Sequence, residues 1–241
     1  MNSRTSGCPP DADVHHRIGC RRADGLALVL ALFVMLLLSA LAAGLALVTA
    51  SEATIAHNFK NGREALYAAD AAAERAIADL DVLPDWSQVL GGAVQSTVVD
   101  GPPSGTRRLA DGSLIDLGEL VNLANCHKKT MCTAAEMDSV TAERPWALNN
   151  PRWRAFLYGR LADFTPGQTV DSPYYVLAMV GDDPAETDAD PMRDSDPPAA
   201  GSGVLILRVH AFGPRGVLRT IELTVARTET GHVRVIAWRP Y

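Results

Sequence analysis

The stretch Leu26–Ala50 reads LALVLALFVMLLLSALAAGLALVTA, an uncharged apolar run of about twenty-five residues. At ~1.5 Å per helical residue, such a run is long enough to cross a hydrocarbon core of ~30 Å. No proline separates it from the amphipathic pattern that begins near Glu52. We therefore predict one continuous helix with a transmembrane half over 26–50 and an amphipathic half over 51–82.

The flanking charges predict how this helix is oriented. Four arginines precede the run, and neither lysine nor arginine lies inside it: Arg4, Arg17, Arg21 and Arg22. The positive-inside rule then leaves the N-terminus cytoplasmic and places residues 83–241 outside as a head. The alternative is a cleaved secretory signal, for which Val48-Thr49-Ala50 offers a small-residue site. Secretory apolar regions are shorter, ~7 to 15 residues, which favours the anchor.

Composition sets limits on size and function. The chain has 241 residues, of which 47% are hydrophobic and 21% charged, which gives room for one span and one head domain. A net charge of −6 without a basic cluster argues against a dedicated nucleic-acid site. The sequence contains no nucleophile elbow, Gly-rich phosphate loop or HExxH helix, and His210 and His232 are interpreted as structural. We expect a protein that is not an enzyme and has no cofactor.

Helical periodicity continues beyond the apolar run. Residues spaced by three and four place one stripe on the helix, and they are Ile55, Phe59, Gly62, Leu66, Ala69, Ala73, Ile77 and Leu80. The stripe suits packing on a sheet or on sister helices, and a juxtamembrane coiled coil has the same periodicity. Gly44, within Ser39–Gly44, adds small residues that permit close helix approach. Pro84 ends the pattern.

The C-terminal third predicts an antiparallel sheet, mainly within 174–238. Its segments are rich in β-forming residues and separated by turn signals, and they span 174–180, 204–212, 217–226 and 233–238. The third segment has a mainly apolar face that fits the Ala-rich helix stripe, and its residues are Val217, Arg219, Ile221, Leu223 and Val225. The predicted fold class is therefore α+β.

The segment 83–170 is harder to interpret. A short helix is expected at 121–124. The larger aromatic residues are interpreted as packing residues rather than as a platform for a ligand, and they are Trp86, Trp146, Trp153, Phe156 and Tyr158.

Two cysteines lie close together in the head. Cys126 and Cys132 occur in NCHKKTMC on the outward side, where thiols oxidise, whereas Cys8 and Cys20 lie in the inward tail. We predict a Cys126–Cys132 disulfide. A zinc site using both cysteines and His127 is the alternative, although it lacks a fourth ligand.

An acidic, Pro-rich segment connects the first two predicted strands. Its carboxylates include Asp182, Asp183, Asp188 and Asp190, with Glu186, Asp194 and Asp196 nearby. Oxygen ligands of this kind are what Ca²⁺ prefers, but the spacing does not match an EF-hand. A solvated loop is the favoured interpretation, with calcium as the alternative.

Several linked motifs resemble the PilX N-terminal family of minor pilins, which is related to the K-type pseudopilins of type II secretion. The resemblance covers about residues 21–80: Gly25 before the apolar run, then Glu52, Ile55 and Asn58, then Tyr67 to Ala71. It implies a pilin-like head on a long helix and a role in type IV pilus assembly. The implied partners are other pilins bound through the helix, the inner-membrane assembly machinery, prepilin peptidase and membrane lipid.

The resemblance also implies processing and location. Prepilin peptidase would remove the leader 1–25 by cleaving between Gly25 and Leu26, although Asp24 stands where a basic or polar residue is more usual. The protein would reside in the bacterial inner membrane with a periplasmic head, and in the pilus after assembly. Major pilins carry a glutamate at the fifth mature position, where this chain has Leu30. Its absence implies a low-copy tip or priming subunit. An anchored sensor or binding module is the alternative from another class.

Overall fold

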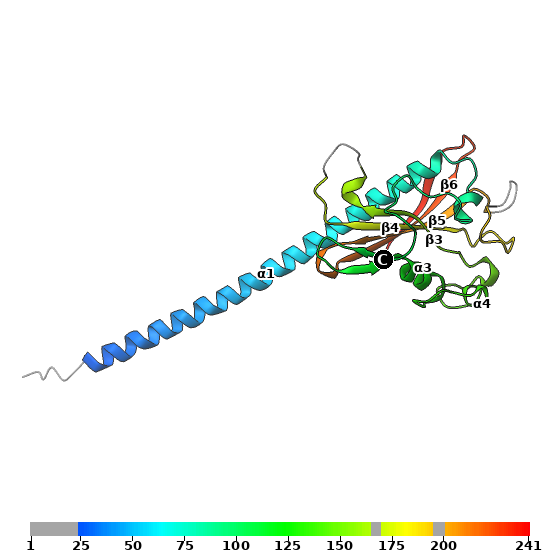
Figure 1. Ribbon diagram of the computed structural model, residues 1–241. Helices are drawn as coiled ribbons and strands as arrows, with labels where there is room; N and C mark the ends of the chain where they lie inside the picture. The colour runs from blue at the N-terminus through cyan, green and yellow to red at the C-terminus, as the bar shows by residue number, and fades with distance from the viewer. Residues whose placement is uncertain (1–23, 165–169, 195–200) are drawn as a thin grey trace, which may run out of the picture. The chain divides into compact units, whose positions relative to one another are not determined.

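The computed structural model describes residues 24–164, 170–194 and 201–241. The chain divides into two compact units, Met1–Ile55 and Ala56–Tyr241. Helix α1 (Asp24–Asp81) belongs to both, because the division falls within it (Figure 1). The long N-terminal helix predicted from the sequence is therefore confirmed. Most of the predicted leader, including Cys8, Cys20 and the four arginines, lies outside the described residues.

The second unit contains a five-stranded antiparallel sheet in the order β3-β4-β5-β6-β7. Each strand pairs with the next one along the chain. The strands are β3 (Arg154–Arg160), β4 (Tyr175–Asp182), β5 (Val204–Phe212), β6 (Leu218–Arg227) and β7 (Val233–Pro240). The last four are the strands predicted from the sequence, so the α+β class is confirmed.

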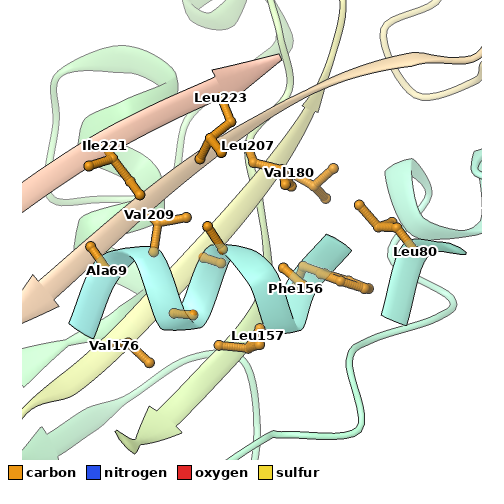
Figure 2. Packing of buried hydrophobic residues seen from close by; sticks show 14 of the residues in the cluster. Ala69, Leu80, Phe156, Leu157, Val176, Val180, Leu207, Val209, Ile221 and Leu223 are labelled. Carbon is orange, nitrogen blue, oxygen red and sulfur yellow. The ribbon is translucent and has the colours of Figure 1, made fainter. Parts of the chain in front are cut away.

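Alanine lines the side of α1 that packs on this sheet. The buried residues follow helical spacing, and they are Ala65, Ala68, Ala69, Ala72, Ala73, Ala76 and Leu80. Because an alanine side chain ends at Cβ, the helix backbone lies close to the strands. Figure 2 shows Ala69 beside Val209 and Ile221, in the same cluster as Leu223. The predicted apolar face of β6 therefore meets the helix as expected.

Strand β3 was not predicted, and burial explains why. Phe156, Leu157 and Tyr158 are consecutive and all buried, because α1 covers one face of the sheet and a second cluster covers the other. A strand buried on both faces lacks the alternation of polar and apolar residues by which strands are recognised.

The second cluster lies on the face of the sheet away from α1. A hairpin of β1 (Thr106–Arg108) and β2 (Leu114–Asp116) and helix α3 (Leu117–Cys126) contribute to it. The expected helix at 121–124 is present and begins earlier, because Asp116 caps it by accepting a hydrogen bond from Glu119 N at 2.9 Å. The buried members of the cluster are Leu109, Leu117, Trp153, Tyr158, Tyr175, Leu177, Met179 and Phe212.

Short elements complete the second unit: α2 (Ser87–Leu90), α4 (Ala134–Met137) and the 3₁₀ turns Ala147–Asn149, Leu161–Asp163 and Pro214–Gly216. Four of the five aromatic residues expected to pack are buried. Trp146 is the exception, with 42% of its surface exposed.

Arg144 organises the segment between α4 and β3. Its guanidinium donates hydrogen bonds to the carbonyl oxygens of Ala124, Met137 and Pro151 at 3.1, 3.2 and 2.9 Å. Burial, together with the nearby positive charge of Arg152, lowers the pKa of Arg144 to about 10. Three carbonyl dipoles thus replace the solvent around a buried cation.

The two edges of the sheet differ. At β3, Ser96 N donates to Phe156 O at 2.9 Å and Asp100 N donates to Tyr158 O at 2.9 Å, so the segment 96–100 covers that edge. Asp79 of α1 holds the segment by accepting hydrogen bonds from Ser96 Oγ and, at 3.1 Å, from Thr97 N. Strand β7 ends the sheet on the other side.

Candidate interaction surfaces

The first unit presents the apolar half of α1. Every residue from Gly25 to Ile55 is exposed, including the leucines of the apolar run. Among the described residues, α1 is the one helix long and apolar enough to cross a membrane, a property also found in signal sequences near an N-terminus. By length and composition, this helix qualifies as a membrane span or signal anchor.

Three hydroxyl side chains at and just beyond the end of the apolar run donate hydrogen bonds to the helix backbone. Thr49 Oγ1 donates to Leu45 O at 3.0 Å, Ser51 Oγ to Val48 O at 2.8 Å and Thr54 Oγ1 to Ala50 O at 2.9 Å. Such bonds satisfy hydroxyl groups that lipid cannot solvate.

Contacts within the chain do not require glycine at Gly25 or Gly44. A Cβ atom added to either residue would meet nothing within 4 Å. Cleavage between Gly25 and Leu26, and helix packing at Gly44, therefore stay predictions about molecules outside this chain.

An exposed aromatic stripe continues on α1 in the second unit. Phe59 and Tyr67 are 68% and 57% exposed, and the guanidinium of Arg63 lies 5.9 and 5.6 Å from their ring centroids. Of the other predicted residues, Leu80 is buried in the head core, and Leu66 and Ile77 are half-buried there. Ile55 is exposed, like Phe59 and Tyr67. Packing on the sheet, one of the two partners predicted for the stripe, is therefore wrong for Ile55 and Phe59, because alanines occupy the buried side. Tyr67, a further candidate for helix packing, is exposed as well. Their packing on sister helices stays a prediction.

The predicted cysteine pair is at disulfide distance. The Cα atoms of Cys126 and Cys132 lie 6.0 Å apart and their sulfur atoms are bonded. His127, which would have to join them in a zinc site, adopts the left-handed conformation at the end of α3 with φ 58°. Its Nε2 lies 3.6 Å from Glu143 Oε2. In the described part of the chain, no group of three His, Cys, Asp or Glu residues is placed to hold a metal ion.

The acidic segment divides into buried and exposed carboxylates. Asp183, Asp188 and Asp190 accept hydrogen bonds from backbone N–H groups two residues on. Asp182 is only 4% exposed, and burial together with the charge of Glu186 raises its pKa to about 8. These four calcium candidates do not form a ligand cluster in the described residues, and Asp196 lies outside them.

A groove of about 670 Å³ lies on the outer face of the sheet, the face away from α1. Side chains of β5 and β6 line it together with Arg239, Tyr241 and Trp146. Glu222 sits between two arginines: its Oε2 is 2.9 Å from Arg208 Nη2 and its Oε1 is 2.8 Å from Arg239 Nη2. Two guanidinium groups thus share one carboxylate.

Each of these two guanidinium groups lies over an aromatic ring. Arg208 lies 4.4 Å from the Trp153 ring centroid and Arg239 lies 4.5 Å from that of Tyr241. His210 beside them has its Nδ1 2.8 Å from Thr220 Oγ1, and burial together with Arg208 lowers its pKa to about 4. His210 is therefore neutral near pH 7, and the positive charges in the groove belong to arginine side chains. This arrangement suits binding of an anionic group.

Sequence reasoning did not find this groove. Arg208, Glu222 and Arg239 lie on three different strands and meet only through strand register. Their spacing along the chain carries no recognisable motif. Comparison with known proteins finds no matching family model, no similar curated protein and no similar solved structure.

Proposed function

We propose that this protein is a minor pilin, similar to PilX, that takes part in assembly of a type IV pilus or a related type II secretion filament. The observation that supports this most strongly is the single helix Asp24–Asp81. Its first half is apolar and exposed on all sides, and its second half packs on a sheet-bearing head. An anchor needs only the first half, whereas a filament subunit uses both.

The apolar half suits a subunit that exchanges lipid for protein neighbours. Lipid chains are about as apolar as leucine, so moving such a helix from the bilayer into a bundle of helices costs little hydrophobic free energy. The arginine-rich leader opposes this transfer, since charges enter hydrocarbon only at high cost. Cleavage after Gly25 removes those arginines and keeps the span.

Leu30 supports a low-copy position for the subunit. A repeating filament subunit would carry an acidic residue there to pair with a neighbour's N-terminal ammonium, and this chain has none. We assign the protein to a low-copy position at the tip or in priming.

The test is the mass of the mature protein from cells with and without prepilin peptidase. We expect loss of residues 1–25 only when the peptidase is present. Gly25→Val should block the loss, whereas the matched variant Gly44→Val in the same helix should be processed normally. An intact N-terminus at Met1 in both strains would contradict the proposal and favour a permanently anchored sensor or binding module.

A further inference from the structure

We propose that the open edge of β7 binds an extended peptide segment of a partner protein, in which acidic and apolar residues alternate. The inference concerns the head alone. It does not depend on whether the protein enters a filament.

At the start of β7, Val233 N donates to Asp81 Oδ1 of α1 at 2.6 Å. Beyond that residue the outer side of β7 is open, because β7 is the last strand in the sheet and no backbone–backbone hydrogen bond is formed beyond it within the described residues. Tyr241 N donates to Thr220 O at 2.9 Å. Because antiparallel pairs alternate between bonded and non-bonded, the N–H and C=O groups of Trp238 point toward the open edge. Such groups are a template for another strand.

Strand register places the charged side chains of β7 on one face. Arg239 is opposite Glu222 and Arg234 is opposite Ala226, and both partners lie on the outer face of β6. The irregular register between Thr224 and Val225 inserts one extra residue in β7, which puts the two arginines on the same face although they are five positions apart.

The opposite face of β7 carries apolar side chains, and the Trp238 indole Nε1 on it donates to Asp70 Oδ1 of α1 at 3.3 Å. Val235 is opposite Val225 and Trp238 is opposite Leu223, residues that lie in the core against α1. Val235 and Trp238 are nevertheless 41% and 46% exposed, because β7 lies at the margin of the core. An added strand would cover them with its own apolar residues.

Charge complementarity selects the occupant. Arg239 already shares Glu222 with Arg208, and Arg234 has no carboxylate partner among residues 24–164, 170–194 and 201–241. An added strand therefore gains cross-strand ion pairs by presenting carboxylates on the outer face. A second copy of β7 would instead bring two further arginines to the same face.

The adjacent groove extends the site and favours a peptide over other anions. Arg239 and Tyr241 line the groove of about 670 Å³ and also continue the edge strand. A free carboxylate or an acidic sugar satisfies the guanidinium groups but not the open backbone. Only a peptide supplies N–H and C=O groups at strand spacing together with carboxylates.

The experiment uses the full chain in detergent and labelled peptides of eight residues, the length of β7. One peptide alternates Glu with Val and the other alternates Lys with Val. Fluorescence anisotropy should show saturable binding of the Glu peptide only. The double variant Arg234→Gln/Arg239→Gln should weaken binding at least about tenfold. The matched variant Arg160→Gln, on the covered edge strand β3, should leave the affinity unchanged.

Hydrogen exchange locates the bound peptide. Protection of the Trp238 amide on addition of the Glu peptide would support strand addition at this edge. The proposal would be overturned by equal binding of both peptides, by no binding, or by protection elsewhere with no change at β7. Dimerisation of the free protein through β7 in sedimentation velocity would assign the edge to a second copy and would overturn it as well. None of these outcomes bears on N-terminal processing.

Discussion

The two halves of α1 carry apolar residues in different ways. Between Leu26 and Ala50 large apolar residues surround the helix and all are exposed. Between Ala65 and Leu80 the buried residues are mostly alanine and lie on one side. A helix that is apolar all round suits lipid or other helices, whereas a stripe of small residues permits close packing on a sheet. One helix thus serves two environments.

The largest expected effect comes from placing a charge in the alanine stripe. Ala72→Arg buries an unpaired guanidinium against the sheet and should lower the free energy of unfolding of the head by about 4 kcal/mol or more. The neighbouring Ala71 is exposed, so Ala71→Arg is a matched control with an expected change within about 0.5 kcal/mol. Thermal unfolding followed by circular dichroism measures both. Similar losses in the two variants would contradict the assigned packing.

A charge in the lower half should act on the membrane instead. Leu37→Arg should oppose insertion by about 2.5 to 3.5 kcal/mol, whereas Leu37→Phe should leave insertion unchanged. Membrane retention after alkaline extraction measures this effect. Head stability should be the same in both variants. Full retention of Leu37→Arg would indicate that this half is not a span.

A change of pH should alter the stability of the head but not the apolar half of α1, because no residue between Leu26 and Ala50 is ionisable. The pKa of Asp182 is raised from 3.8 to about 8, so the folded state favours its neutral form. The stability that this provides is complete below pH 3.8 and is lost as the pH rises through 8.

Asp182→Asn removes this pH dependence. We expect the variant to exceed the parent in unfolding free energy at pH 8 by at least about 1.4 kcal/mol, the value of one pKa unit, and to differ little at pH 4. His210 acts in the opposite direction, since its lowered pKa destabilises the fold as the pH falls from 6.5 toward 4. Measuring variant against parent at each pH isolates Asp182.

The smallest effect on the isolated protein is expected at the aromatic stripe. Phe59→Ala removes an exposed ring that contacts Arg63, and it should change head stability by less than about 1 kcal/mol. If Phe59 packs on neighbouring subunits, recovery of the variant in sheared filaments should nevertheless fall. Equal recovery of the variant and the parent would remove this residue from the assembly interface.

Sequence patterns predicted the features that depend on residues close together along the chain. Strands β4 to β7 are rich in β-forming residues with turn signals between several of them, and Pro84 follows the last helical turn of α1. The stripe on α1 was placed correctly at Ala69, Ala73 and Leu80, but it included Phe59 because spacing alone does not show where the sheet ends. The Cys126–Cys132 pair was also predicted, since the two cysteines are only six positions apart.

Features that depend on distant partners were not predicted. Arg144 binds three carbonyl groups from separate segments, and no local sequence pattern indicates this role. The groove requires the register of β5, β6 and β7 to bring Arg208, Glu222 and Arg239 together. The segment 96–100 covers the edge of β3, and it is held there by Asp79 of α1, which accepts hydrogen bonds from Ser96 and Thr97. These are tertiary relations that one sequence does not reveal.

The central claim is that the apolar half of α1 leaves lipid and packs on other filament subunits. Photo-crosslinking in cells from a reactive residue at position 37 tests it most directly. The account predicts covalent adducts with other pilins that are recovered in sheared surface filaments. Adducts with lipid alone, in protein that remains entirely in the membrane fraction while filaments form, would contradict it.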